Sequence, residues 1–184
     1  IDPLLFDLFA GDPRLMPHLH LSLQHGSDLI LKRMKRRHLR RDAIDLVSRL
    51  KQVRPDIAIG ADLIAGFPTE TDTHHAENCS IIEELSIVHG HIFPYSPRPG
   101  TPAARMPQLD RATIKGRASE LRAVVAKVRG EWLQSLVGES QCVLIERDGT
   151  GYAENFARVE APAGSVPGTI QSITPHVLEE GLLK

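Results

Sequence analysis

"HLHLSLQHGSD", residues 18 to 28, is the stretch that decides how the chain is expected to fold. Its apolar positions are Leu19, Leu21 and Leu23, and its polar positions are His18, His20, Ser22 and Gln24. Alternation with a period of two predicts a strand with one polar face. A helix capped by Ser27 or Asp28 follows, and then a second strand and another helix, the order of a parallel sheet covered by helices. We therefore expect the polar face to line the cavity of an open βα barrel, where a polar ligand binds.

The rest of the chain divides into a βα part and a small β part. Helices are expected over residues 3–11, from 28 through the basic run, and over 42–53, 70–85 and 110–137, with further strands over 57–67 and 86–96. After Gly138 the pattern changes to short strands separated by turn residues, over 141–162 and 168–175. The sequence thus predicts an α/β domain over residues 1–137 and a small antiparallel β module over 138–184.

Composition and charge narrow the class of protein. The 184 residues are 41% hydrophobic and 24% charged, with a net charge of -1, so the chain can bury a core. Seven Lys or Arg lie within residues 32–41, which makes a local basic patch despite the neutral total. The two cysteines, Cys79 and Cys142, lie far apart and form neither a disulfide framework nor a metal knuckle, which favours a reducing cytoplasm.

The ends and the hydropathy of the chain add two expectations. No apolar run reaches the roughly 20 residues that a membrane span needs, and no signal peptide is visible, so no membrane association is expected. The chain opens on Ile1-Asp2-Pro3 rather than Met, with Asp2 placed to cap a helix. We interpret it as a fragment of a longer protein.

Three motifs resemble a known family. "HLHLSLQHGSDLILKRMKRRH" (18–38), "GADLIAGFPTETD" (60–72) and "FPYSPRPGTPAARMPQ" (93–108) are similar to the second half of the radical S-adenosylmethionine (SAM) methylthiotransferases, above all the branch that acts on threonylcarbamoyladenosine in tRNA. "GYAENFARV" (151–159) resembles the small RNA-binding TRAM domain that closes this family. The resemblance implies the C-terminal part of a (β/α)6 partial TIM barrel, with its last three strands, followed by a TRAM-like module.

The resemblance also implies two cofactors, SAM and a 4Fe-4S cluster. The family's C-x3-C-x2-C cluster motif is not in this chain, so its ligands are expected in a missing N-terminal half, and this fragment is expected to hold no catalytic residue and no metal ligand. The intact enzyme would replace an adenine ring hydrogen with a methylthio group, with one SAM as radical source and another as methyl donor. The fragment alone is expected to be inactive.

Candidate SAM-binding residues follow from position and from resemblance. In βα barrels, ligands meet the carboxyl ends of the strands, and Arg36 matches the family position that we assign to the methionyl carboxylate. The candidates are Ser22, Gln24, Arg36, Asp62, Gly66, Phe93 and Tyr95. Glu70, in the segment that resembles the one along adenine, sits one place later than in the general pattern.

Each candidate also has a structural interpretation. Ser22 and Gln24 can satisfy backbone groups at a strand end, and Arg36 can lie on a solvated basic face. Asp62 can face a helix and form an ion pair with a charged side chain there. Gly66 can serve only to form a turn, and at least one of Phe93 and Tyr95 can be a core residue.

Candidate tRNA contacts come from the basic run, from the loop after the third strand and from the tail. They are Arg37, Arg40, Arg98, Arg105, Tyr152 and Asn155. The expected partners are therefore tRNA and the missing N-terminal half of the same protein.

Three other functions stay open. The first is membership of the isopentenyladenosine or the ribosomal-protein branch of the family, and the second is a non-catalytic RNA-binding module. The third is a TIM-barrel metallohydrolase, because the pairs "HLH" and "HGH" match the His-x-His spacing of its zinc site. Against a zinc site, His18 opens its strand and so lies towards the face of a barrel opposite the functional rim.

Overall fold

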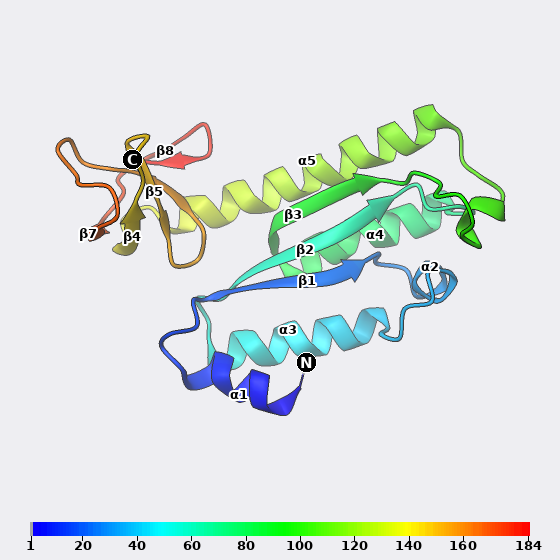
Figure 1. Ribbon diagram of the computed structural model, residues 1–184, viewed down its shortest axis with the longest axis horizontal. Helices are drawn as coiled ribbons and strands as arrows, with labels where there is room; N and C mark the ends of the chain where they lie inside the picture. Colours follow the sequence, from blue (N-terminus) through cyan, green and yellow to red (C-terminus); the bar gives the residue numbers. More distant parts are fainter. Residues whose placement is uncertain (1) are drawn as a thin grey trace.

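A computed structural model describes residues 2–184 and contains two separate sheets (Figure 1). The first is parallel, with strands in the order β1 (His18–Gln24), β2 (Ala58–Ala65) and β3 (Ile87–Pro94). The second has six strands and lies beyond the end of the long helix α5 (Arg111–Ser135). The other helical elements are α1 (Pro3–Gly11), α2 (Asp28–Arg33), α3 (Arg40–Val53), α4 (Asp72–Leu85) and the short 3-10 helix η1 (Ala103–Arg105).

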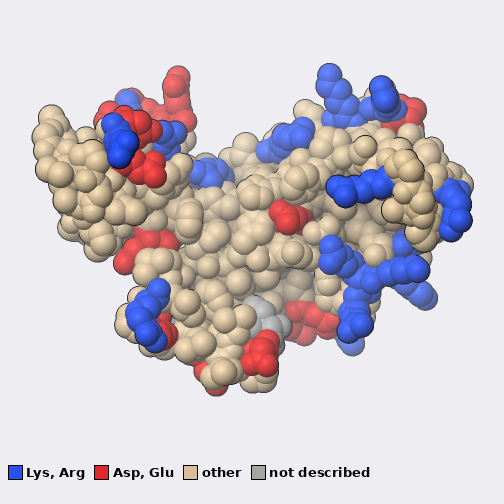
Figure 2. Space-filling view, viewed as in Figure 1, with Lys and Arg blue, Asp and Glu red and all other residues tan. Residues whose placement is uncertain are grey.

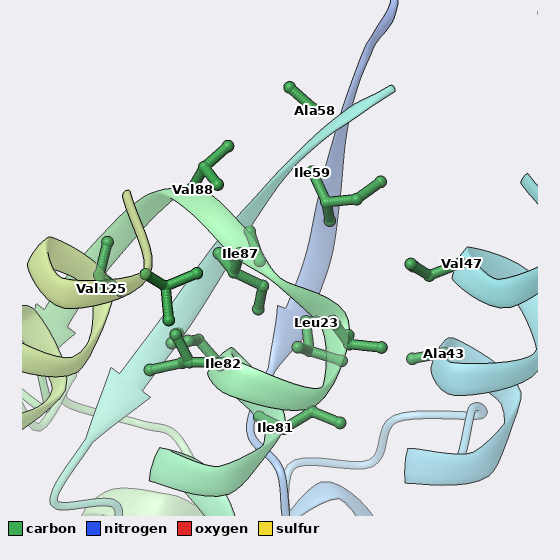
Figure 3. Close-up of a cluster of buried hydrophobic side chains, with 14 of the residues drawn as sticks. Leu23, Ala43, Val47, Ala58, Ile59, Ile81, Ile82, Ile87, Val88 and Val125 are labelled. Carbon is green, nitrogen blue, oxygen red and sulfur yellow. The ribbon is translucent and has the colours of Figure 1, made fainter. Parts of the chain in front are cut away.

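Helices cover one face of the parallel sheet. Leu23, Ile59 and Leu63 are buried on that face, and they pack with residues of α3, α4 and α5 in one hydrophobic cluster. Figure 3 shows side chains of β1 and β2 pointing towards Ala43 and Val47 of α3. Burial of this apolar face drives the three βα units together.

The helix ends follow from local chemistry. The Thr71 side chain accepts a hydrogen bond from the backbone N–H of His74 at the start of α4. The Asp110 carboxylate does the same for Thr113 at the start of α5, with a distance of 2.9 Å. Such caps satisfy the free N–H groups of the first turn, so both helices begin within two residues of their expected positions.

The basic run does not lie on one helix, which corrects the expectation for this segment. Helix α2 ends at Arg33, and Lys35 adopts a left-handed conformation with φ of 58°. The run therefore covers the end of α2, the turn after it and the start of α3. The run therefore does not form one helical face.

The second sheet has its own core. Its strands are β4 (Gln141–Ile145), β5 (Thr150–Ala153), β6 (Arg158–Glu160), β7 (Ile170–Ile173), β8 (Leu178–Glu179) and β9 (Leu182–Leu183), in the order β7-β4-β5-β6-β9-β8. All neighbours are antiparallel except β6 and β9. Val143, Val159 and Leu183 are fully buried there, and Trp132 of α5 packs against both cores.

The observed fold is a mixed α/β chain with a parallel and a separate antiparallel sheet. The three parallel strands form an open sheet, so the (β/α)6 barrel stays a prediction. Within residues 2–184, none of the helices is long and apolar enough to cross a membrane.

Candidate functional site

The face of the parallel sheet that the helices do not cover is polar. It carries His18 and His20 from β1, Asp62 from β2, and His89 and His91 from β3. Figure 2 shows this face as mostly uncharged, with Lys and Arg side chains gathered at the end where α2 and the loop after β3 lie. The polar face of β1 thus continues across the sheet, through Asp62 of β2, to the histidines of β3.

Three of these side chains converge. His20 Nε2 and His91 Nδ1 lie 3.0 and 3.2 Å from the same oxygen, Oδ1 of Asp62. Asp62 and His91 are direct partners in the β2–β3 register, and His20 is opposite Gly60. A Cβ at Gly60 would lie 2.4 Å from His20 Nδ1, so this glycine makes room for the imidazole. The three ligand atoms lie within 4.8 Å of one another and could hold a metal ion.

The other pair of histidines connects the sheet to the β module. Arg129 of α5 donates to His89 Nδ1 at 2.8 Å, and His89 Nε2 donates to the backbone oxygen of Asn155 at 3.1 Å. Burial lowers the pKa of His89 to about 4, so this imidazole is neutral at physiological pH. The His18 ring packs 4.6 Å from that of Phe156. This pair therefore has a structural role.

A cavity of about 530 Å³ lies at the carboxyl ends of the strands. Gln24, Asp62, Phe93 and Tyr95 line it together with Arg98. Gln24 has a φ of 73°, a conformation that few residues other than glycine adopt and that often marks a functional site. The Tyr95 hydroxyl is buried and has no hydrogen-bond partner among the described residues. A buried hydroxyl without a partner is costly.

Three of the seven predicted SAM residues lie elsewhere. Ser22 borders a hollow between β1 and α3, and Arg36 is exposed in the turn after α2. Gly66 is buried with a φ of 73°, and a Cβ there would lie 2.6 Å from a side-chain carbon of Ile114. The geometry of Gly66 agrees with the interpretation that it forms a turn.

Glu70 is a buried anion at the centre of a network that sequence reasoning did not find. Its Oε2 accepts hydrogen bonds from the backbone N–H of Gly66 and Phe67, at 2.8 and 3.0 Å. His25 Nε2 donates to the same oxygen at 3.3 Å, and Arg117 of α5 donates to Oε1 at 3.2 Å. The loops after β1 and β2 and the helix α5 are thereby fixed to one carboxylate below the cavity.

The pKa values in this network follow from its contacts. Burial opposes ionisation of Glu70, but the hydrogen bond from His25, the His75 imidazole 3.6 Å from Oε1 and the charge of Arg117 outweigh it and lower the pKa of Glu70 to about 2. Burial lowers the pKa of His25, which therefore donates as a neutral imidazole. Contact with the Cys79 sulfur, followed by Glu70, raises the pKa of His75 to about 10. Glu70 is ionised and His75 is protonated at neutral pH.

Of the six candidate tRNA residues, four are exposed and two have structural contacts. Arg37, Arg98, Arg105 and Tyr152 are exposed. The Arg40 guanidinium instead donates to the backbone oxygens of Gly26 and Glu77 and pairs with Glu84. Asn155 is buried, and its side chain accepts a hydrogen bond from the backbone N–H of Ala157. Arg40 and Asn155 thus have structural contacts of their own.

The chain's cysteines do not fit an iron–sulfur cluster. Cys79 lies on α4 and Cys142 on β4 of the other sheet, whereas a 4Fe-4S site needs about three or four converging thiolates.

Sequence reasoning also missed the convergence of His20, Asp62 and His91. Position along the strand argues against a metal site only for His18, which lies at the start of β1. The usable signal was that His20, Asp62 and His91 all occupy the polar phase of three adjacent strands.

Comparison with known proteins gives one consistent result. The chain is 42% identical over 184 residues to the threonylcarbamoyladenosine tRNA methylthiotransferase MtaB of Rickettsia prowazekii, covering 100% of the chain and 44% of that protein. It is 36% identical over 181 residues to the tRNA-2-methylthio-N(6)-dimethylallyladenosine synthase of Paracoccus denitrificans, covering 92% of the chain and 41% of that protein. The synthase of the same name from Bartonella bacilliformis is 43% identical over 136 residues, which are 73% of the chain and 30% of that protein. No family model matches the chain. The chain spans less than half the length of these relatives.

Proposed function

The chain belongs to the radical SAM tRNA methylthiotransferases, and we propose that it is the carboxyl-terminal part of an enzyme that methylthiolates threonylcarbamoyladenosine beside the anticodon of tRNA. The observation that supports this most is 42% identity over the whole chain to a relative named for this substrate. Relatives named for dimethylallyladenosine match at similar identity over shorter stretches, so the substrate branch is the part of the proposal that most needs a test.

The proposal has a consequence for the architecture. Residues 1–137 form the last three βα units of a (β/α)6 barrel, and residues 138–184 form a TRAM-like module. A further N-terminal part of the enzyme completes the barrel over the polar face of β1, β2 and β3 and supplies the cluster cysteines. The open, polar state of this face supports the idea, because a parallel sheet is normally covered on both faces.

The cavity at the strand ends is the proposed SAM site. Gln24 and Tyr95 offer polar groups to it, and Phe93, which is 49% exposed, offers an apolar surface for a ring. Arg98 lies at the same cavity and can approach an anionic group. When bound, SAM supplies the hydrogen-abstracting radical and the methyl group. The residues of this chain bind and orient it.

Ser22, Arg36, Asp62 and Gly66 have different places in this scheme. Asp62 lines the cavity, whereas Ser22 and Arg36 reach SAM only if the completing part of the barrel brings it towards them. Gly66 keeps the loop after β2 close to α5, and Glu70 fixes that loop from below. Gly66 and Glu70 are therefore positioning residues for the cavity.

The basic end of the molecule is the proposed tRNA surface. Arg37 lies in the turn after α2, and Arg98 and Arg105 lie in the loop after β3, all at the end where Figure 2 shows basic side chains. This end also holds the cavity, so phosphate contacts there would place an anticodon loop over the SAM site. Tyr152 of the β module adds an exposed ring for stacking. A tRNA substrate places the enzyme in the cytoplasm.

Mass spectrometry of tRNA nucleosides tests the function. The complete protein is expressed in a bacterial strain that lacks all adenosine methylthiolation, and digested tRNA is analysed. We expect the methylthio group on threonylcarbamoyladenosine. Its appearance on isopentenyladenosine would overturn the branch, and its absence from both nucleosides, with the protein folded and its clusters intact, would overturn the proposed activity.

A matched pair of variants connects the function to the site. Gln24→Ala removes a side chain at the cavity, whereas Gln52→Ala makes the same change on the exposed side of α3. We expect the first to lower the modified fraction and the second to leave it unchanged. Equal activity of both variants would remove Gln24 from the proposed site.

A further inference from the structure

We propose that His20, Asp62 and His91 form a binding site for a single zinc ion on the polar face of the parallel sheet. Each of the three strands supplies one ligand. The two His-x-His pairs on β1 and β3 each contribute their second histidine. This inference does not rest on the proposed function, because it is argued only from the geometry of three side chains, one of which, Asp62, also lines the cavity.

The distances agree with a metal polyhedron. Zinc binds imidazole nitrogen at about 2.0–2.1 Å and carboxylate oxygen at about 2.0–2.2 Å, so neighbouring ligand atoms of a tetrahedron lie roughly 3.3 Å apart. The carboxylate oxygen lies 3.0 Å from His20 Nε2 and 3.2 Å from His91 Nδ1, and all three atoms lie within 4.8 Å. Small rotations of these side chains would bring all three ligand atoms to bonding distance from one ion.

The backbone holds these ligands in place. His91 is paired with Asp62 across β2 and β3, and the His20 ring lies over Gly60, its partner in the β1–β2 register. Sites built on strands are held more firmly than sites on loops. The imidazole rings of His20 and His91 are 4.7 Å apart between centroids, which brings two ring nitrogens to one carboxylate.

The donor set selects the class of metal. Two imidazoles and one carboxylate suit zinc and other first-row transition ions, whereas magnesium and calcium prefer oxygen ligands. Three protein ligands leave the fourth position of a tetrahedral ion for water or another donor. Because Asp62 also lines the cavity, that position is open towards the space where a polar ligand would bind.

The other histidine pair is a weaker candidate. Both nitrogens of His89 are engaged, one by Arg129 and one by the backbone of Asn155. His18 packs against Phe156 and lies at the amino end of β1. The two pairs therefore give a clear contrast between a metal-binding set and a structural set.

Calorimetric titration of the metal-free chain with Zn²⁺ tests the proposal. We expect one equivalent to bind, and expect His20→Ala, His91→Ala and Asp62→Asn each to weaken binding at least tenfold. His176→Ala removes an exposed histidine of the β module and is the matched control, with unchanged affinity expected. With Co²⁺ in place of zinc, the wild-type chain should show the visible absorption of a four-coordinate ion.

Gly60→Ala tests the geometry without removing a ligand. Its new Cβ would displace the His20 ring, so affinity should fall while thermal unfolding without metal stays close to that of the wild type. The proposal is overturned if the chain binds no zinc, or if the three ligand variants bind one equivalent as tightly as the control. Loss of binding in His18→Ala but not in His20→Ala would also overturn it.

Discussion

The two faces of the parallel sheet use the same three strands for different purposes. On the helix-covered face, Leu23, Ile59 and Leu63 are buried in a continuous apolar cluster. On the other face, histidines and an aspartate lie on the same strands, in the alternate phase, and no helix of residues 2–184 covers them. One face therefore stabilises this chain, and the other is the face that we propose binds ligands.

Substitutions of two adjacent residues on β2 should give the largest difference in the free energy of unfolding. Leu63 is fully buried on the helix side, whereas Ile64 is half-buried on the cavity side. Leu63→Ala should lower the free energy of unfolding by about 3–4 kcal/mol, because it leaves a cavity in the core. Ile64→Ala should cost about 1 kcal/mol. Urea denaturation measures both, and equal losses would contradict the division between the faces.

Removal of the Glu70 charge should give the next largest effect. Arg117 would lose its buried partner and keep only the exposed carboxylate of Asp72, so Glu70→Gln should cost about 3 kcal/mol. Asp72→Asn changes the other carboxylate that Arg117 contacts, but Asp72 is fully exposed and its loss should have little effect. Similar unfolding midpoints for the two variants would show that the network contributes little.

The lowered pKa of the Glu70 carboxylate predicts that the folded chain loses stability in acid. The pKa of Glu70 is about 2 in the folded chain against an ordinary value of 4.5. A lowered pKa stabilises the fold fully above about pH 4.5, and this contribution is lost as the pH falls towards 2. The difference in unfolding free energy between the wild type and Glu70→Gln should therefore shrink over that window. A constant difference would refute the assignment.

His75 predicts a smaller effect at alkaline pH. Its pKa is raised from 6.5 to about 10, so its contribution is complete below about pH 6.5 and is lost as the pH rises towards 10. Thermal unfolding of the wild type should weaken over this range more than that of His75→Asn. Parallel pH profiles of the two proteins would argue against a protonated His75.

Substitutions at the basic end should change the salt dependence of tRNA binding rather than the stability of the fold. Arg36→Glu combined with Arg37→Glu should lower the slope of log affinity for tRNA against log salt by about 0.7–0.9 for each phosphate that the protein no longer neutralises. Arg14→Glu is a control outside the basic end and the β module, where Arg14 already pairs with Asp12. Filter binding over a salt series measures the slopes, and an unchanged slope in the double variant would make this end an ordinary solvated surface.

Much of the fold was predictable because local signals agreed with tertiary packing. The alternation from His18 to Gln24 and the caps at Thr71 and Asp110 place β1, α4 and α5 within two residues of their observed bounds. The course of the basic run was not predictable, because Lys35 adopts a left-handed conformation that lysine rarely takes and that no local residue pattern marks.

The site was predictable only in part. Gln24, Phe93 and Tyr95 meet at one cavity because parallel strands bring their carboxyl ends together. The roles of Glu70 and Arg40 depend on partners more than 35 residues away, which no local pattern reveals. The contact of His20 and His91 with Asp62 depends on strand register, which periodicity alone does not fix.

SAM binding to the complete, cluster-loaded protein tests most directly whether the cavity at the ends of these strands is a ligand site. Equilibrium dialysis compares Gln24→Ala and Tyr95→Phe with Gln52→Ala and Tyr152→Phe, which make the same changes at exposed positions. The account predicts about three- to tenfold weaker binding for the first two, because each loses a hydrogen bond worth about 1 kcal/mol, and no change for the controls. Wild-type affinity in both cavity variants would contradict it.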